Sequence, residues 1–152
     1  MIESQIPGVT VTPLSQWSDA RGWLIELFRE DGLAEDFRPV MGYVSMTLPG
    51  VARGPHEHEH QTDGFAFISG KFDLYLWENR PGHPERHEKH SVGEGEKVFI
   101  TVPPGVVHAY KNVGAGEGLV LNFPDKLYAG WGKKEPVDEI RHENDEASRF
   151  QL

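Results

Sequence analysis

Two stretches decide the fold: Pro55-His56-Glu57-His58-Glu59-His60-Gln61-Thr62-Asp63, followed by Gly70, and Pro103-Pro104-Gly105-Val106-Val107-His108-Ala109-Tyr110-Lys111-Asn112. His56 and His58 are two residues apart, a spacing that puts both side chains on one face of a strand. Asp63 follows after a gap of four residues. In the second stretch a Pro-x-Gly turn directs the following strand, so that His108 faces the same interior. We therefore expect one divalent metal to be held by four side chains: His56, His58, Asp63 and His108.

The ligand types limit the metal. The sequence contains no cysteine, so a metal must be bound through nitrogen and oxygen. Three imidazoles and one carboxylate suit Zn, Fe, Mn, Ni, Co or Cu, and ligand type alone does not select among these ions. Glu57, Glu59 and His60 are the alternatives to Asp63. The remaining histidines are expected to be solvated surface residues: His60, His83, His87, His90 and His142.

Short apolar runs separated by turn residues predict an all-β protein. The chain has 17 Gly and 11 Pro, and they fall between these runs. The expected strands are 9–12, 22–28, 41–48, 65–69, 72–78, 97–102, 107–112 and 119–123. Ser69-Gly70-Lys71 is interpreted as a tight hairpin, and Gly32–Phe37 as one or two helical turns. About eight strands in this length indicate an antiparallel jelly roll or closed β-barrel.

Length and charge narrow the class further. A chain of 152 residues fits one domain, with a core barrel over about 9–128 and a C-terminal extension over 129–152. The net charge of −9 argues against nucleic acid as a partner. No apolar run is long enough to cross a membrane, and the N-terminus does not look like a signal peptide, so a cytoplasmic location is the default expectation. The acidic stretch Asp138–Glu146 is expected to be a solvated tail.

Both motif stretches resemble the two motifs of the cupin superfamily. The first matches His-x-His, four residues, an acidic residue, six residues and glycine, with Asp63 where the superfamily usually has Glu. The second matches Pro-x-Gly, two residues, His, three residues and Asn. The resemblance implies a single cupin-type jelly-roll barrel that binds a metal.

A second resemblance is to the dTDP-4-dehydrorhamnose 3,5-epimerase family, which is itself cupin-like. It rests on Asp19-Ala20-Arg21-Gly22-Trp23-Leu24-Ile25-Glu26, Arg53-Gly54-Pro55-His56 and Pro103–His108, and it extends from about Asp19 to about Tyr128. The resemblance implies that Arg21 and Arg53 bind a nucleotide diphosphate and that Glu26 contacts the base. It also puts His56 at the position of the proton-abstracting base of that family.

Departures from the epimerase pattern point to a metal. His58 stands where the family usually has Gln, Asp63 replaces the lysine that stabilises an enolate, and Leu121 replaces the tyrosine acid. The first two changes would turn a metal-free pocket into a metal site. If His56 binds the metal it is not also the base. Tyr110, on the same strand face as His108, then becomes a candidate acid or base.

These observations favour an epimerase or isomerase that acts on a nucleotide-linked keto sugar. Two alternatives stay open: a non-catalytic module that binds a sugar or another small molecule, and a metal-dependent oxygenase. A homodimer is expected, because barrels of this size often pair through an edge or N-terminal strand, and in the resembled family that exchange completes the nucleotide site. The sequence leaves the substrate, the nucleotide base and the metal undetermined.

Overall fold

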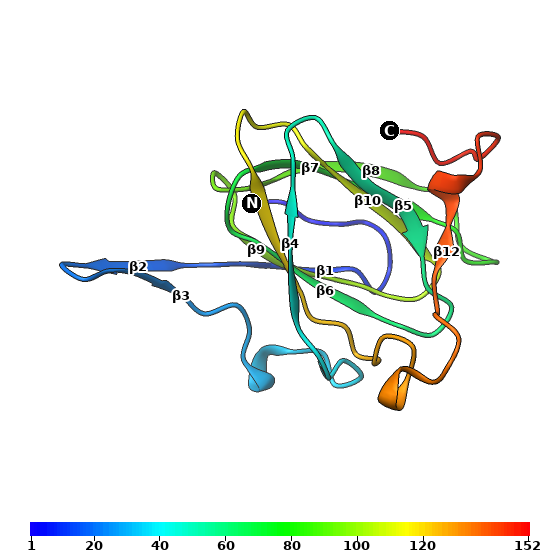
Figure 1. The fold of residues 1–152 in the computed structure, drawn as a ribbon, viewed down its shortest axis with the longest axis horizontal. Coiled ribbons are helices and arrows are strands. Elements are labelled where there is room, and N and C mark those ends of the chain that lie inside the picture. Colours follow the sequence, from blue (N-terminus) through cyan, green and yellow to red (C-terminus); the bar gives the residue numbers. More distant parts are fainter.

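Two five-stranded antiparallel sheets face each other in the computed structural model, which describes residues 1–152 (Figure 1). The first sheet has the order β1 (Thr10–Pro13), β9 (Val98–Val102), β6 (Asp63–Phe67), β11 (Gly118–Asn122) and β4 (Tyr43–Thr47). The second has the order β12 (Ile140–Arg141), β5 (Ala52–Glu57), β10 (Val106–Asn112), β7 (Lys71–Glu78) and β8 (His87–Gly93). A separate hairpin consists of β2 (Gln16–Asp19) and β3 (Gly22–Ile25).

The expected all-β jelly roll is confirmed, although the two sheets stay separate and do not close into a barrel. The only helical segments are three short 3₁₀ turns, at Glu30–Gly32, Trp131–Lys133 and His142–Asn144. None of these turns has the length or the apolar composition needed to cross a bilayer. The only 3₁₀ turn in this region ends at Gly32, so the helical turns expected over Gly32–Phe37 do not form.

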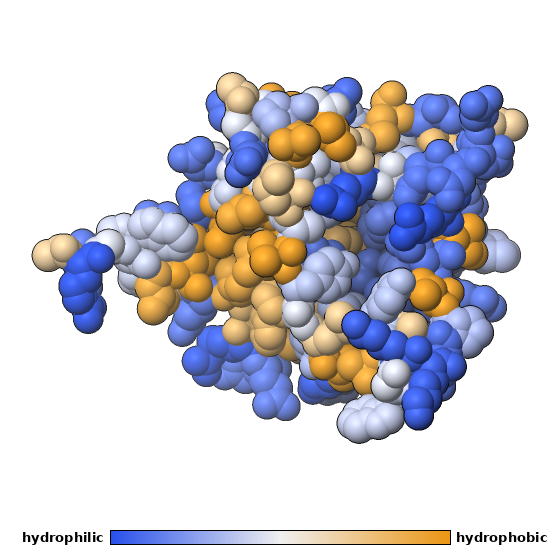
Figure 2. All heavy atoms as spheres, in the orientation of Figure 1, coloured by the Kyte–Doolittle hydropathy of each residue, from blue (hydrophilic) through white to orange (hydrophobic).

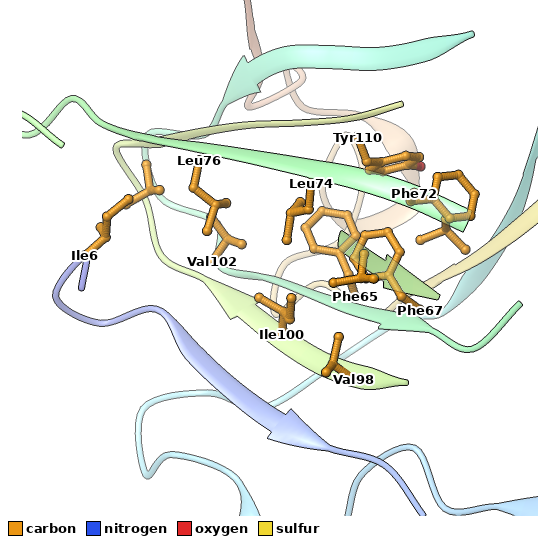
Figure 3. Packing of buried hydrophobic residues seen from close by; sticks show 13 residues of the cluster. Ile6, Phe65, Phe67, Phe72, Leu74, Leu76, Val98, Ile100, Val102 and Tyr110 are labelled. Atoms are coloured by element: carbon orange, nitrogen blue, oxygen red, sulfur yellow. The ribbon is translucent and has the colours of Figure 1, made fainter. Parts of the chain in front are cut away.

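The main core lies between the two sheets and is made of alternate residues on their strands (Figure 3). On β7, Phe72, Leu74 and Leu76 are fully buried in this core, as the period of two predicts. Tyr75 and Trp77 point to the opposite face of the strand, and they are also buried, beneath Phe150. Both faces of the second sheet are therefore covered, the inner one by the first sheet and the outer one by the C-terminal end of the chain.

The turn at Ser69-Gly70-Lys71 does not form a hairpin, contrary to the sequence interpretation. β6 pairs with β9 and β11, whereas β7 pairs with β8 and β10, so the turn carries the chain from one sheet to the other. Gly70 has φ +69°, and a Cβ at this position would lie 3.0 Å from the Cα of Gly118. The turn needs glycine for its backbone conformation and for this close approach.

Four strands were not expected from the sequence: β2, β5, β8 and β12. β8 falls in the region interpreted as a charged, solvated loop, and its His90 is mostly buried with Nε2 2.9 Å from Glu88. His142 is also mostly buried, which corrects its expected surface position, whereas His60 is exposed as predicted. β8 lies at the edge of its sheet, where polar residues are common. Its largely polar sequence shows no alternation of apolar and polar residues, so the strand was not recognised.

The β2–β3 hairpin projects from the body of the protein and carries exposed apolar side chains (Figure 1). Trp17, Trp23 and Leu24 are each more than half exposed. Figure 2 shows that the apolar surface continues from the base of the hairpin onto the neighbouring face of the body. The edge strand β4 lies on that face, where Val44 and Met46 are exposed.

The acidic stretch Asp138–Glu146 is held against the body of the protein and is not a free tail, although most of its residues are exposed to solvent as expected. Ile140 and Arg141 form β12, which pairs with β5 at Glu57 and His56. Beyond it, Phe150 is only 5% exposed and joins the cluster on the outer face of the second sheet. Three of its carboxylates, those of Asp138, Glu139 and Glu143, lie close to groups of the site described below.

Candidate active site

The four predicted metal ligands come together at one end of the space between the sheets. His56 on β5 and His108 on β10 are direct cross-strand partners, and His58 follows one residue after the end of β5. Asp63 begins β6 on the facing sheet. One possible ligand atom from each of the four residues lies within 4.8 Å of all the others. The cluster therefore spans both sheets, with an arrangement suited to a divalent cation.

Hydrogen bonds to the backbone define which nitrogen of two rings faces the cluster. His58 donates from Nδ1 to the carbonyl of Asp138, and His108 donates from Nδ1 to the carbonyl of Val106 over 3.0 Å. The Nε2 atoms then face Asp63 Oδ2, at 2.8 Å from His58 and 3.2 Å from His108. Such bonds from the outer nitrogen of a ring are typical of metal-binding histidines.

The arrangement of polar atoms around Asp63 favours a bound cation. His108 Nε2 is buried and makes no hydrogen bond of acceptable geometry, although it lies 3.2 Å from Asp63 Oδ2. A neutral ring that donates from Nδ1 presents a lone pair at Nε2, and this lone pair repels a carboxylate. Either a second proton on a ring or a metal between the rings and Asp63 removes that repulsion. The three nitrogens and one oxygen fit a first-row divalent metal.

The electrostatics of His56 and His58 differ strongly. Burial, together with the nearby His108 and His58, lowers the pKa of His56 to about 2. Burial also acts to lower the pKa of His58, but the hydrogen bond and charge of Asp63 and the carbonyl of Asp138 outweigh it and raise that pKa to about 9. For Asp63, burial acts to raise the pKa, but the close rings of His108 and His58 outweigh it and bring that pKa well below its usual range. His56 is thus a neutral ring with a free lone pair, as metal coordination requires.

A large pocket opens above the cluster, with a volume of about 1020 Å³. His56, His58, Asp63 and Arg53 all line it. The guanidinium of Arg53 is held by Thr47 Oγ1 at 2.9 Å and by the carbonyl of Met46 at 2.8 Å. This size accommodates a ligand well above that of a free monosaccharide.

Tyr110 reaches the same pocket from β10 but belongs largely to the core. It is 4% exposed, packs against Phe65 and Phe67, and its hydroxyl lies 3.1 Å from Ser45 Oγ. Burial raises its pKa, while the bond to Ser45 partly offsets that effect. Tyr110 therefore presents a neutral hydroxyl beside the cluster.

Several polar residues of the pocket were missed by the sequence reasoning. Glu139 and Glu143 each have a carboxylate oxygen 3.8 Å from His56 Nδ1. Both carboxylates thus lie beside the histidine that the resemblance puts at the position of the proton-abstracting base. Asn122 also lines the pocket, and its buried Oδ1 has no hydrogen-bond partner. No sequence signal identified the two glutamates, because they lie in an acidic stretch with no motif of its own.

Other predicted residues lie away from this pocket. Arg21 is 91% exposed at the tip of the hairpin and is paired with Asp19 at 2.6 Å. Glu26 lines a separate, smaller cleft beside the base of the hairpin. Leu121 packs in the apolar cluster around Phe99, so it does not occupy the pocket position expected from the resemblance. The pocket-facing residue of β11 is its neighbour Asn122.

The jelly roll and the His/Asp cluster at one end of it define the class of this protein, a cupin. The sequence profile of a family described as "Polysaccharide biosynthesis C-terminal domain" matches residues 17–132. The chain belongs to this family.

Sequence relatives carry names from glycan synthesis. The "Probable low-salt glycan biosynthesis epimerase Agl13" of Haloferax volcanii is 35% identical over 126 residues, which cover 81% of each chain. The "Spore coat polysaccharide biosynthesis protein SpsL" of Bacillus subtilis is 32% identical over 126 residues, covering 81% of this chain and 82% of SpsL.

Solved structures show the same fold. A dTDP sugar isomerase from Desulfovibrio desulfuricans superposes with a TM-score of 0.84 at 21% identity, covering 99% of this chain and 94% of the isomerase. ChmJ, a 3'-monoepimerase from Streptomyces bikiniensis solved with dTDP-quinovose, gives 0.78 at 21% identity, covering 93% and 72%. The fold expected from the resemblance to dTDP-sugar epimerases and isomerases is thereby confirmed.

Proposed function

We propose that this protein is an epimerase or isomerase that acts on a nucleotide-linked keto sugar, with dTDP as the nucleotide. The observation that carries the proposal is the large pocket whose floor holds a convergent cluster of histidines and a carboxylate. Membership in a polysaccharide-biosynthesis family with a named epimerase supports it. The dTDP-sugar isomerase of the same fold supports the choice of nucleotide.

A divalent metal is proposed as part of this site, held by His56, His58, Asp63 and His108. When bound, the metal supplies the positive charge that stabilises an enolate beside a keto group, the role of the lysine in the resembled epimerases. Other groups of the chain hold the proposed ligands in the form that binds an ion. They fix the tautomers of His58 and His108 through backbone carbonyls and keep His56 neutral by burial.

Tyr110 is the proposed proton-transfer residue of the metal-loaded site, and His56 is the proposed base only of a site that holds no metal. With His56 committed to the metal, the hydroxyl of Tyr110 is the candidate acid or base, and Ser45 holds it in place at 3.1 Å. The carboxylates of Glu139 and Glu143 lie 3.8 Å from Nδ1 of His56, beyond hydrogen-bond distance, and are proposed to act on this ring through their charge. This arrangement keeps polar groups on several walls of the pocket.

Substrate binding is proposed to involve Arg53, Arg21 and Glu26. Arg53 lines the pocket, and a guanidinium offers phosphate a bidentate contact. Arg21 and Glu26 lie on or beside the projecting hairpin, outside the pocket of their own chain. A homodimer, in which the hairpin of one protomer reaches the other, would bring these two residues to a nucleotide in the partner's pocket.

Metal content is the first test of this proposal. Elemental analysis of the purified protein is expected to find close to one divalent metal per chain. The double variant His58→Gln, Asp63→Lys, which restores the side chains of the resembled epimerases, is expected to lose the metal. Equal metal content in the two proteins would contradict the proposed ligand set.

Activity is tested by incubating the protein with a dTDP-linked 4-keto-6-deoxy sugar in D₂O. Removal and return of a proton beside the carbonyl replaces hydrogen by deuterium, which mass spectrometry detects as a gain in mass. Absence of deuterium incorporation, with the nucleotide sugar still bound, would instead indicate a binding module. Oxygen uptake in the same assay would indicate an oxygenase.

A further inference from the structure

The segment from Asp138 to Phe150 lies beyond the residues that the family profile matches, which end at 132. It nevertheless forms one wall of the pocket and covers the outer face of the second sheet. β12 adds this segment to the edge of the sheet beside His56. Any contribution of this segment to the site therefore comes from outside the region that the family profile matches.

Asp138 makes an unusual number of contacts at the site. Its carboxylate accepts hydrogen bonds from three consecutive backbone N–H groups: Glu59 at 2.8 Å, His60 at 2.9 Å and Gln61 at 3.0 Å. Its own backbone carbonyl accepts the Nδ1 proton of His58. One residue thus holds both the turn that follows His58 and the ring of His58 itself.

The two contacts of Asp138 set the direction in which Nε2 of His58, a proposed ligand atom, points. With Nδ1 of His58 bound to the carbonyl, Nε2 points at Asp63 Oδ2, 2.8 Å away. The turn held by the carboxylate of Asp138 also carries Gln61, which donates from Nε2 to the other oxygen of Asp63 over 2.7 Å. Asp138 therefore controls the orientation of two of the four proposed ligands without facing the cluster itself.

The segment is anchored on the far side as well. His142 lies 3.2 Å from Glu57 and packs against the ring of Phe150, with ring centroids 4.6 Å apart. Phe150 in turn packs against Trp77. These contacts attach the segment to β5 through Glu57 and to β7 through Trp77.

We propose that Asp138 is a positioning residue for the metal site, and that the segment Asp138–Phe150 is the strap that keeps it in place. The inference rests on the metal site proposed above and adds to it a residue that sets metal affinity without coordinating the ion. Partners of this kind, which orient metal ligands, contribute about 10- to 100-fold to metal affinity.

Zn²⁺ affinity provides the main test, measured by competition with a chromogenic chelator. Asp138→Ala is expected to bind Zn²⁺ about 10- to 100-fold more weakly than the wild type. Asp145→Ala is the matched control, because Asp145 is an aspartate of the same segment whose carboxylate accepts a backbone hydrogen bond from Ala147, away from the cluster. Its affinity is expected to be unchanged. Wild-type affinity in Asp138→Ala would overturn the proposal.

The variant Asp138→Asn keeps the test decisive if Asp138→Ala does not fold. Asparagine preserves the shape, but its amide nitrogen faces backbone N–H groups and repels them, so weaker Zn²⁺ binding is again expected. Circular dichroism and thermal unfolding establish that each variant is folded. Wild-type affinity in a folded Asp138→Asn protein, with Asp138→Ala unfolded, would overturn the positioning role.

NMR on the metal-free protein separates this inference from the proposed function. The Nδ1 proton of His58, held by a partly buried carbonyl, is expected to give a slowly exchanging resonance that is absent from His58→Gln. The Asp138 variants keep this carbonyl but lose the carboxylate bonds that hold it against the turn. Loss of the resonance in these variants supports the positioning role even if the wild type binds no Zn²⁺. A resonance that persists in them would overturn it.

Discussion

At the residue scale, the candidate site depends on which nitrogen of each histidine is protonated. His58 and His108 both donate from Nδ1 to backbone carbonyls, so their Nε2 atoms converge on Asp63. The motif spacing predicted that these residues meet, but it did not predict their tautomers. The carbonyls that decide them come from different places: Val106 is two residues from its histidine, whereas Asp138 is 80 residues from His58.

Tyr110→Phe tests the proposed proton-transfer residue. Loss of the hydroxyl is expected to reduce turnover by at least about 100-fold, the size typical of general acid–base catalysis. The unfolding free energy should fall by only about 1 kcal/mol, since one hydrogen bond to Ser45 is lost. The deuterium-incorporation assay and elemental analysis check the two effects, with metal content expected to stay intact. Unchanged turnover would remove Tyr110 from the mechanism.

Glu78 gives a pH-dependent contribution to stability away from the site. Its hydrogen bonds from Arg80 lower the pKa of this buried carboxyl, so the folded state binds its proton less readily than the unfolded state. The stabilisation is therefore present above the unfolded pKa of about 4.5, and it is lost as the pH falls through the lower folded value.

Glu78→Gln is expected to lower the unfolding free energy by about 2 kcal/mol at pH 7, the size of a hydrogen bond to a charged group. The difference from the wild type should shrink below pH 4, where the wild-type carboxyl also becomes protonated. Thermal unfolding at pH 7 and pH 3 measures both values. A difference that grows on acidification would contradict this explanation.

At the scale of elements, the sequence was informative where apolar residues alternate along a strand and poor where the strand is largely polar. β7 was located because Phe72, Leu74 and Leu76 alternate with residues of the other face. β8 was missed because its sequence is largely polar. The partner strands of β6 and β7 were also mistaken, since a short turn is compatible with a hairpin and with a crossing between sheets.

The C-terminal strap gives the prediction at this scale. Phe150→Ala removes a ring that is 5% exposed and packs on Trp77, so it is expected to cost about 3 kcal/mol of unfolding free energy. Urea denaturation measures this loss. Leu152→Ala serves as the control, because Leu152 is 49% exposed and should change stability by less than about 0.5 kcal/mol. Equal effects of the two substitutions would show that the strap is not anchored by Phe150.

At the scale of the whole molecule, the projecting hairpin and the edge strand β4 leave a broad apolar surface (Figure 2). Large exposed apolar areas on a folded protein usually mark an interface. A homodimer that covers this surface would bring Arg21 and Glu26, which lie outside the pocket of their own chain, toward the pocket of the partner. Homodimerisation was expected from the sequence and stays a prediction.

Val44→Asp tests the dimer. Val44 is 60% exposed on β4, so a charge there should leave the fold intact while disfavouring burial against a partner. Analytical ultracentrifugation is expected to show a dimer for the wild type and a monomer for Val44→Asp. Leu152→Asp, at another exposed apolar position, should stay dimeric. A wild-type protein that sediments as a monomer at micromolar concentration would refute the dimer.

The sequence by itself determined the all-β class and the convergence of His56, His58, Asp63 and His108, because strand periodicity and motif spacing are local properties. Only the tertiary structure decided the rest. Packing of Phe150 on the outer face of the sheet brings Asp138, Glu139 and Glu143 to histidines about 80 residues earlier in the chain. The sequence of an acidic stretch does not indicate its partners, since charged side chains can lie in water or line a pocket. Contacts with residues far away in the chain decide between these two environments.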